Sequence, residues 1–262
     1  MNDYDALLID LDGTLYHGRR MIPGADELIS GLRKAAIPFL FVTNNSSRTP
    51  EGVAEHLSGM GIPAKPEEVA TSSLAAAGYI AGRSPGARVM PIGEEGLRQS
   101  LAAAGLFLTE EQPDYVVQGI DRSFNYETLT RAARAIQNGA EFVLTNPDLM
   151  LPSDDGLMPG AGTLGAAIEA ASGMKPVVIG KPYSHLMTYS TSRLGIDPKR
   201  ALVVGDNMRT DIAAGVTAGC RTILVLTGVT TSSNLERHQA ETGLTADYIC
   251  GDLQELHKLL SL

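Results

Sequence analysis

The sequence predicts an α/β fold with a doubly wound parallel sheet, and two observations lead to this prediction. Short apolar runs recur along the 262 residues, and they are continuous rather than alternating, which indicates strands buried on both faces. Helix-length stretches separate these runs, and several of them end in glycine, a common helix stop. Strands that alternate with helices are typical of a parallel sheet covered by helices on both sides.

The elements follow one another in a regular order. The first strand, Ala6-Leu7-Leu8-Ile9, is wholly apolar and ends at a carboxylate, and the second is interrupted only by Pro38 near its start. Continuous apolar runs predict strands at residues 6–9, 37–42, 177–179, 201–204 and 222–226. Helical patterns lie between them at residues 25–36, 50–60, 72–81, 185–194 and 210–218.

A second α/β domain is expected inside the first. The middle of the chain has strand signals of its own at residues 87–92, 115–117 and 142–144, and helix signals at 94–104 and 126–138. This segment separates two groups of residues, described below, that must meet in space. We therefore expect a core formed by residues 1–82 and 177–262, with an inserted domain at 83–176.

Composition and charge exclude several classes of protein. The chain has 30 acidic and 21 basic residues, a net charge of −9, which argues against nucleic-acid or anionic-membrane partners. The negative net charge is still compatible with a small phosphorylated ligand, because one lysine and a few backbone amides can bind a phosphate. The acidic N-terminal residues are unlike a secretory signal, and no apolar run reaches the ~20 residues of a membrane span. Cys220 and Cys250 show no metal-ligand spacing, so we expect a reducing, cytoplasmic location.

Acidic residues follow the first predicted strand. Ligands of doubly wound sheets bind at the carboxyl ends of the strands, so the polar residues there are the candidate site. A spacing of two places Asp10 and Asp12 on the same side of an extended segment. Two such carboxylates suit Mg²⁺, which prefers hard oxygen ligands and keeps room for a substrate phosphate. The alternative is a simple turn, since Asp-Gly pairs are common in turns.

Other strand ends carry residues that complement these carboxylates. Thr43 and Asn44 can donate hydrogen bonds to phosphate oxygens, although such residues also cap helices. Lys181 follows three apolar residues and supplies a positive charge at the same edge, if it is more than an ordinary surface lysine. Asp206 offers another metal ligand. Asp211 either supports the ligands from behind or is a first-turn acid favoured by a helix dipole.

Together these segments resemble the four motifs of the haloacid dehalogenase superfamily. The motifs occur in the family's order as Asp10-x-Asp12-Gly-Thr14, Thr43-Asn44, Lys181 and Gly205-Asp206-Asn207-x-x-Thr210-Asp211. The chain also resembles the NagD-type branch, a group of 4-nitrophenylphosphatase-like sugar and nucleotide phosphatases with an α/β cap between the second and third motifs. The resemblance implies a Rossmann-like core with an inserted α/β cap.

The resemblance also implies a mechanism. Asp10 would be the nucleophile that forms an aspartyl-phosphate, and Asp12 the general acid and base. Mg²⁺ would be bound by the side chains of Asp10 and Asp206 and by the backbone carbonyl of Asp12. Thr43, Asn44 and Lys181 would bind the phosphate, with Asp211 and Asn207 supporting the metal ligands.

The same resemblance favours a phosphatase. Dehalogenating members lack the second aspartate of the first motif, which is present here as Asp12. The implied substrate is a small phosphorylated metabolite, a sugar phosphate or a nucleotide, with 4-nitrophenyl phosphate as a laboratory substrate. A homodimer is compatible with the sequence.

Asn146 and Asp148 are the candidate specificity residues. They belong to Thr145-Asn146-Pro147-Asp148, which follows the apolar run 142–144 of the inserted domain. Asn-Pro is a common turn initiator, so a purely structural turn is one interpretation. The NagD-type cap carries a similar segment, which implies that these two side chains recognise the leaving group.

Two other functions are weighed against the phosphatase. The first is a non-catalytic or regulatory phosphate-binding relative, disfavoured because Asp10 and Asp12 are both present. The second is a nicotinamide oxidoreductase, because Gly160-x-Gly162-x-x-Gly165 satisfies the dinucleotide-binding pattern. No buried strand is expected before these glycines, and no acidic residue occupies the position of a ribose ligand.

Overall fold

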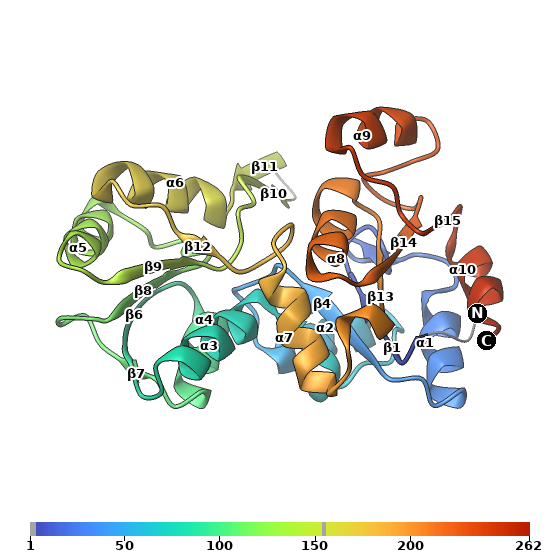
Figure 1. Ribbon diagram of the computed structural model, residues 1–262, viewed down its shortest axis with the longest axis horizontal. Helices are drawn as coiled ribbons and strands as arrows, with labels where there is room; N and C mark the ends of the chain where they lie inside the picture. Colours follow the sequence, from blue (N-terminus) through green and yellow to red (C-terminus); the bar gives the residue numbers. More distant parts are fainter. Residues whose placement is uncertain (1–3, 154–155) are drawn as a thin grey trace. The chain divides into compact units, whose positions relative to one another are not determined.

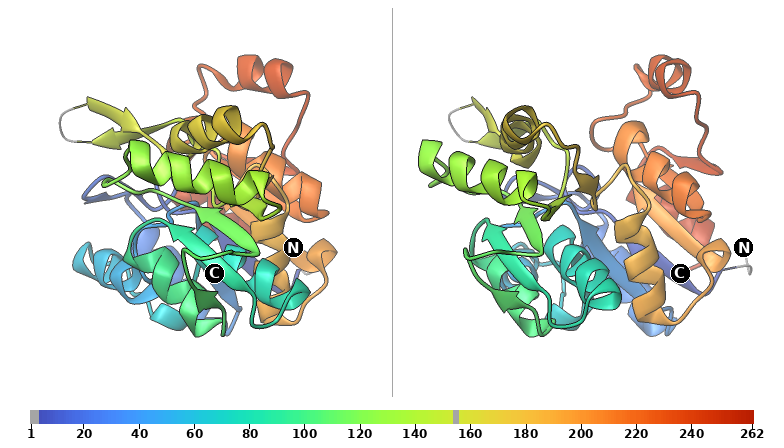
Figure 2. Two further views of the ribbon diagram at one scale, coloured as in Figure 1. Left: turned by 90° about the vertical axis from the view of Figure 1, so that its left-hand side faces the viewer. Right: turned by 60° about the vertical axis from the view of Figure 1, so that its left-hand side comes forward.

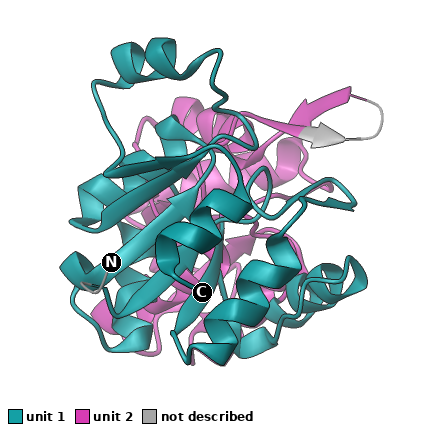
Figure 3. Cartoon of the chain, turned by 90° about the vertical axis from the view of Figure 1, so that its right-hand side faces the viewer, with its two compact units in different colours: residues 1–43, 50–70, 181–262 teal, residues 44–49, 71–180 magenta. Residues whose placement is uncertain are grey.

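The computed structural model describes residues 4–153 and 156–262, and contacts within the chain divide it into two compact units (Figure 3). Unit 1 contains residues 1–43, 50–70 and 181–262, and unit 2 contains residues 44–49 and 71–180. The domain boundaries expected from the sequence, with a core of 1–82 and 177–262 and an inserted domain of 83–176, stay a prediction. The contact-based division differs from them at residues 44–49, 71–82 and 177–180, which it assigns to unit 2.

Unit 1 is built on a six-stranded sheet. Each β1 residue pairs with β13, and Ile9 pairs with both Val204 and Phe41, so β1 lies between β13 and β4. The pairs β1–β4, β1–β13, β13–β14 and β14–β15 are parallel. The strand order is β15 (Tyr248–Cys250), β14 (Arg221–Val225), β13 (Ala201–Gly205), β1 (Ala6–Ile9), β4 (Phe39–Thr43) and β5 (Val69–Thr71).

The strands of unit 1 are buried on both faces, as their continuous apolarity predicts. Alternate residues such as Leu7 and Ile9 face one core, together with side chains of α1 (Ala25–Lys34), α2 (Pro50–Gly59) and α10 (Leu253–Leu260). Helices α7 (His185–Leu194) and α8 (Ala213–Ala218) contact each other, and α7 packs against β1 and β4. Both end at glycines with positive φ, Gly195 and Gly219, a conformation that glycine adopts without steric cost.

Shorter elements complete unit 1. A small antiparallel hairpin follows the first motif, formed by β2 (Tyr16–His17) and β3 (Arg20–Met21). A π-helical turn at Met208–Ile212 follows β13 directly and continues into α8. The remaining elements are α9 (Leu235–Thr242) and the 3-10 turns Pro66–Glu68 and Pro198–Arg200.

Unit 2 has a parallel sheet of its own, with five strands. Their order is β12 (Val177–Val178), β9 (Glu141–Leu144), β8 (Tyr115–Gln118), β6 (Arg88–Ile92) and β7 (Phe107–Leu108). Helices α5 (Tyr126–Gln137) and α6 (Ala161–Ser172) cover one face, and α3 (Ser72–Arg83) and α4 (Glu95–Ala103) cover the other (Figures 1 and 2). An antiparallel hairpin of β10 (Met150–Ser153) and β11 (Gly156–Pro159) precedes α6.

The two sheets confirm the predicted α/β class, but one strand was assigned to the wrong sheet. We expected residues 177–179 in the core sheet, whereas β12 pairs with β9 in unit 2, Val177 opposite Val143. An apolar run predicts that a strand is buried, and it carries no information on its partner. The chain returns to unit 1 only at Lys181.

The helices of the described chain are short. The longest, α3, α5 and α6, have 12 residues each, whereas a membrane span takes ~20. Among residues 4–153 and 156–262, no helix has both the length and the apolar character that crossing a membrane requires.

Candidate active site

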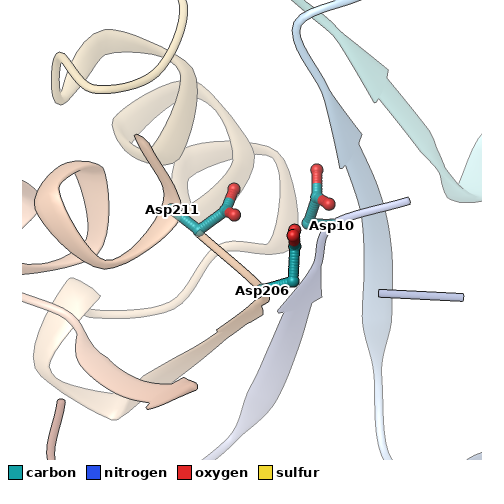
Figure 4. Close-up of side chains that lie close together, drawn as sticks. All are labelled: Asp10, Asp206 and Asp211. Carbon is teal, nitrogen blue, oxygen red and sulfur yellow. The ribbon is translucent and has the colours of Figure 1, made fainter. Parts of the chain in front are cut away.

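Three aspartates gather at the carboxyl edge of the unit 1 sheet. Oxygens of Asp10, Asp206 and Asp211 lie within 4.8 Å of one another, and Figure 4 shows the carboxylates grouped together. Asp10 directly follows β1, and Asp206 directly follows the neighbouring strand β13, so parallel pairing brings the two side by side. Asp211 lies in the π-helical turn after β13, which returns its side chain to the same edge.

Lys181 binds two of these aspartates. Its side chain is buried, and its Nζ donates hydrogen bonds to Asp10 Oδ1 and, at 2.6 Å, to Asp211 Oδ1. The hydroxyl of Thr14 donates to the other oxygen of Asp10 at 3.2 Å. Lys181 therefore lies with the carboxylates as expected, although the strand before it belongs to the other sheet.

The cluster carries an excess of negative charge away from water. Asp206 and Asp211 are buried, and the side chain of Asp10 is only 12% exposed. Burial and the charge of Asp211 raise the pKa of Asp10 well above its usual range and the pKa of Asp206 to about 7. Burial alone would lower the pKa of Lys181, but the charges of Asp10 and Asp211 outweigh it and raise that pKa. With all three carboxylates ionised, one lysine leaves two negative charges uncompensated, so the site favours a further cation.

A loop after β14 holds Asp206 in place. The backbone N–H of Val229 donates to Asp206 Oδ2 at 2.5 Å. A Cβ at Gly228 would lie 2.1 Å from that oxygen, and a Cβ at Gly13 would lie 2.5 Å from it. Both positions therefore need glycine so that the backbone can approach the carboxylate.

The next residue of this loop supports the turn that carries Asp211. The backbone N–H of Thr230 donates to the carbonyl of Asp206 at 3.0 Å, and its buried hydroxyl accepts from the N–H of Met208 at 3.2 Å. The N–H of Asn207 donates to Asp211 Oδ2 at 3.1 Å. Sequence reasoning missed Gly228, Val229 and Thr230. The available signal was the polar, glycine-containing segment directly after an apolar run.

Asp12 and Thr43 also lie in unit 1. Asp12 is exposed, and its side chain is not one of the three that gather. The surrounding protein still removes enough solvent to raise the pKa of Asp12, which the nearby His17 partly offsets. Thr43 is the last residue of β4, the neighbour of β1 on the side opposite to β13.

The other predicted binding residues form a second group, within unit 2. The side-chain amide of Asn44 donates to Asp148 Oδ2 at 3.1 Å, and that of Asn146 donates to the carbonyl of Asn44 at 2.9 Å. The N–H of Asp148 donates to Asn146 Oδ1 at 3.2 Å. The structure thus brings Asn44 together with two predicted residues that lie 102 and 104 positions later in the sequence.

The glycine-rich segment 160–165 does not form a dinucleotide site of the expected kind. An antiparallel hairpin, not a parallel strand, leads into α6. The N–H of Gly162, which would face a pyrophosphate, donates instead to the carbonyl of Asp148 at 2.9 Å. This geometry argues against the nicotinamide alternative.

Comparison with known families decides the relationship of the chain. The model of the haloacid dehalogenase-like hydrolases matches residues 7–107, and a second model of HAD-hydrolase-like proteins matches residues 178–256. The chain belongs to the haloacid dehalogenase-like hydrolases. The matched regions contain Asp10, Lys181 and Asp206, and the predicted family resemblance is confirmed.

Relatives of this hydrolase are similar over nearly their whole length. The 5′-nucleotidase YutF of Bacillus subtilis (strain 168) is 48% identical over 230 residues, which cover 88% of this chain and 90% of that protein. The acid sugar phosphatase of Staphylococcus aureus (strain USA300) is 46% identical over 237 residues, covering 90% and 92%.

Solved structures agree with these relatives. The p-nitrophenyl phosphatase from Archaeoglobus fulgidus is 36% identical with a TM-score of 0.92, covering 98% of this chain and 99% of that one. A glycerol phosphate phosphatase from Mycobacterium tuberculosis, solved in complex with magnesium, is 43% identical with a TM-score of 0.89, covering 97% and 77%.

Proposed function

We propose that this hydrolase is a Mg²⁺-dependent phosphatase that cleaves small phosphate monoesters through a phosphorylated Asp10. The observation that carries the proposal is the acidic cluster with its buried lysine. Catalysis of phosphoryl transfer depends mainly on positioning the reactants and on neutralising charge. This cluster combines a carboxylate that can act as nucleophile, Asp10, with the positive charge of Lys181.

The residues of the cluster fit Mg²⁺. The donors are hard carboxylate oxygens, and a divalent cation would cancel the two uncompensated charges. We assign the ion to the side chains of Asp10 and Asp206 and to the backbone carbonyl of Asp12. We assign Asp211 to holding Lys181, because its oxygens accept hydrogen bonds from Lys181 and from the N–H of Asn207. When bound, Mg²⁺ offsets negative charge on the phosphate and on the aspartates.

The chain's own residues carry the chemistry. A carboxylate oxygen of Asp10 bonds to phosphorus while the bond from phosphorus to the leaving oxygen breaks. Asp12 gives its proton to that oxygen, then takes a proton from the water that hydrolyses the phosphorylated Asp10. The raised pKa of Asp12 favours the protonated form that the first step requires. Lys181 keeps Asp10 in position and offsets charge on the phosphate.

Substrate recognition is assigned to the other predicted residues. Thr43 and Asn44 would donate hydrogen bonds to the phosphate, and Asn146 and Asp148 would recognise the leaving group. The names of the relatives, a 5′-nucleotidase and an acid sugar phosphatase, support nucleotides or sugar phosphates as the substrate class.

Phosphate release from 4-nitrophenyl phosphate and from a panel of sugar phosphates and nucleotides tests the proposal. Asp10→Asn should lower the rate to below about 1% with the melting temperature retained, whereas Asp26→Asn on α1 should keep the rate. EDTA should stop turnover, Mg²⁺ should restore it, and Ca²⁺ should support it poorly because its coordination is larger and looser. Substantial turnover by Asp10→Asn, or full activity in EDTA, would contradict the proposal.

A further inference from the structure

Helix α6 begins directly on the turn that carries Asn146 and Asp148. The N–H of Gly162 donates to the carbonyl of Asp148 at 2.9 Å, and the N–H of Gly160 donates to the carbonyl of Leu149 at 2.7 Å. The hydroxyl of Thr163 adds a bond to the same Leu149 carbonyl at 2.6 Å. The N–H groups of the N-cap residue Gly160 and of Gly162 in the first turn of α6 are thus used to hold this turn, where a helix leaves its amides unpaired.

The glycines here are required for space and not for backbone conformation. Gly160 has a φ of −90°, and neither Gly160 nor Gly162 has a positive φ. A Cβ at Gly160 would lie 2.0 Å from the carbonyl oxygen of Asp148, and one at Gly162 would lie 2.2 Å from that of Pro147. Those atoms are backbone, so no side-chain rotation can relieve the contact. The close packing of α6 on this turn therefore requires that neither position carries a side chain.

Hydrogen bonds within this turn hold the predicted recognition residues Asn146 and Asp148, together with Asn44. Asn146 binds the carbonyl of Asn44, Asn44 binds the carboxylate of Asp148, and Asp148 binds Asn146 through its N–H. Asn146 is buried, and Asn44 and Asp148 are half-buried. A shift of the Pro147 or Asp148 backbone therefore moves the whole group.

We propose that Gly160 and Gly162 are positioning residues for substrate specificity. They let the start of α6 pack on the Asn146–Asp148 turn and hold its side chains ready to bind the leaving group. This inference rests on the proposed function. It assigns the glycine pattern, which resembles a dinucleotide-binding loop, to the recognition of the alcohol part of a phosphate monoester.

Gly162→Ala tests the inference, because the added methyl group must displace the carbonyl of Pro147. The measured quantity is the specificity constant for the best sugar phosphate or nucleotide divided by that for 4-nitrophenyl phosphate. We expect this ratio to fall at least tenfold. Removing recognition of the natural leaving group affects the large substrate more, whereas mere destabilisation would lower both constants together.

Gly165→Ala is the matched control, on the same helix and in the same glycine pattern. A Cβ there would lie 3.0 Å from the methyl groups of Leu144 and 3.1 Å from Gln118 Oε1, which are ends of flexible side chains. The melting temperature should change, but the ratio should stay within twofold of the wild type.

Two further variants keep the inference testable if Gly162→Ala fails to fold. Thr163→Val removes only the exposed hydroxyl that binds Leu149, and the ratio should fall about threefold. Asp148→Ala should lower the ratio, and Gly162→Ala or Thr163→Val should lower it no further in that background.

The outcomes separate the two proposals. A wild-type enzyme that releases phosphate from no substrate would refute the proposed function and this inference with it. An active wild type whose ratio is unchanged in the folded α6 variants, or falls equally in Gly165→Ala, would refute the inference alone.

Discussion

At the scale of single residues, the environment of each aspartate decides its chemistry. Asp10, Asp12 and Asp206 have the same side chain, but Asp206 is buried beside other carboxylates, whereas Asp12 is exposed. Asp206 consequently holds its proton to a higher pH than an aspartate in water, unless a cation balances its charge. Asp12 lies outside the cluster, and we propose it for proton transfer.

This difference predicts how the stability of the metal-free protein depends on pH. Burial and the charge of Asp211 raise the pKa of Asp206 from 3.8 to about 7 in the folded state. Between these values the folded state binds more protons than the unfolded state, so the free energy of unfolding falls as pH rises through this window. With EDTA present, the melting temperature should be several degrees lower at pH 8 than at pH 5.

Asp206→Asn is the control for this measurement, because its side chain does not titrate. The loss of stability between pH 5 and pH 8 should be smaller in that variant. Added Mg²⁺ should stabilise the wild type more at pH 8 than at pH 5, since the ion competes with the proton. An equal pH slope in both proteins would contradict the assignment of the raised pKa to Asp206.

At the scale of elements, strand ends were predictable and loop contacts were not. Asp10 and Asp206 could be placed together because parallel strands bring their carboxyl ends to one edge. The loop with Gly228, Val229 and Thr230 was not predicted, because only the folded backbone shows that its amides reach Asp206. The strand at 177–179 was predicted from its apolar residues. That it pairs with β9 could not be predicted, because a local sequence pattern does not specify the neighbouring strand.

The loop after β14 should tune the affinity of the metal site. Thr230→Val removes the buried hydroxyl that accepts a hydrogen bond from the N–H of Met208 and leaves that amide unpaired. Substituting a group that orients a metal ligand typically lowers metal affinity or activity by about 10- to 100-fold. We expect the Mg²⁺ concentration for half-maximal activity to rise about tenfold.

Thr217→Val is the comparison for this change. Its hydroxyl is exposed and binds only a carbonyl within its own helix, that of Ala213. The Mg²⁺ requirement of this variant should equal that of the wild type. Equal requirements in Thr230→Val and the wild type would show that the hydrogen bond between Met208 and Thr230 does not contribute to the affinity for Mg²⁺.

At the scale of the whole molecule, each unit has a hydrophobic core of its own. The core of unit 1 includes Ile9, Phe41 and Val204, and a core of unit 2 includes Val116, Phe142 and Ile168. The proposed metal ligands all belong to unit 1. Ligand binding stabilises the structure that forms the site, so the two units should respond differently to Mg²⁺.

Hydrogen exchange followed by mass spectrometry can detect this difference. Peptides that cover β1, β13 and the loop 227–230 should exchange at least tenfold more slowly when Mg²⁺ is added. Peptides that cover β6 and β8 of unit 2 should change less than twofold. Equal slowing in both units would mean that they unfold as one cooperative body.

The pairing of β1 with β13 has a consequence for the order in which the chain folds during synthesis. Ala6 pairs with Ala201, 195 positions later, while unit 2 uses only residues up to 180. A ribosome that adds about 5–20 residues per second needs about 10–40 s to cover that distance. Unit 2 can therefore complete its sheet while the apolar strands β1 and β4 still lack β13. We therefore expect unit 1 to complete its sheet only after unit 2 has all of its residues.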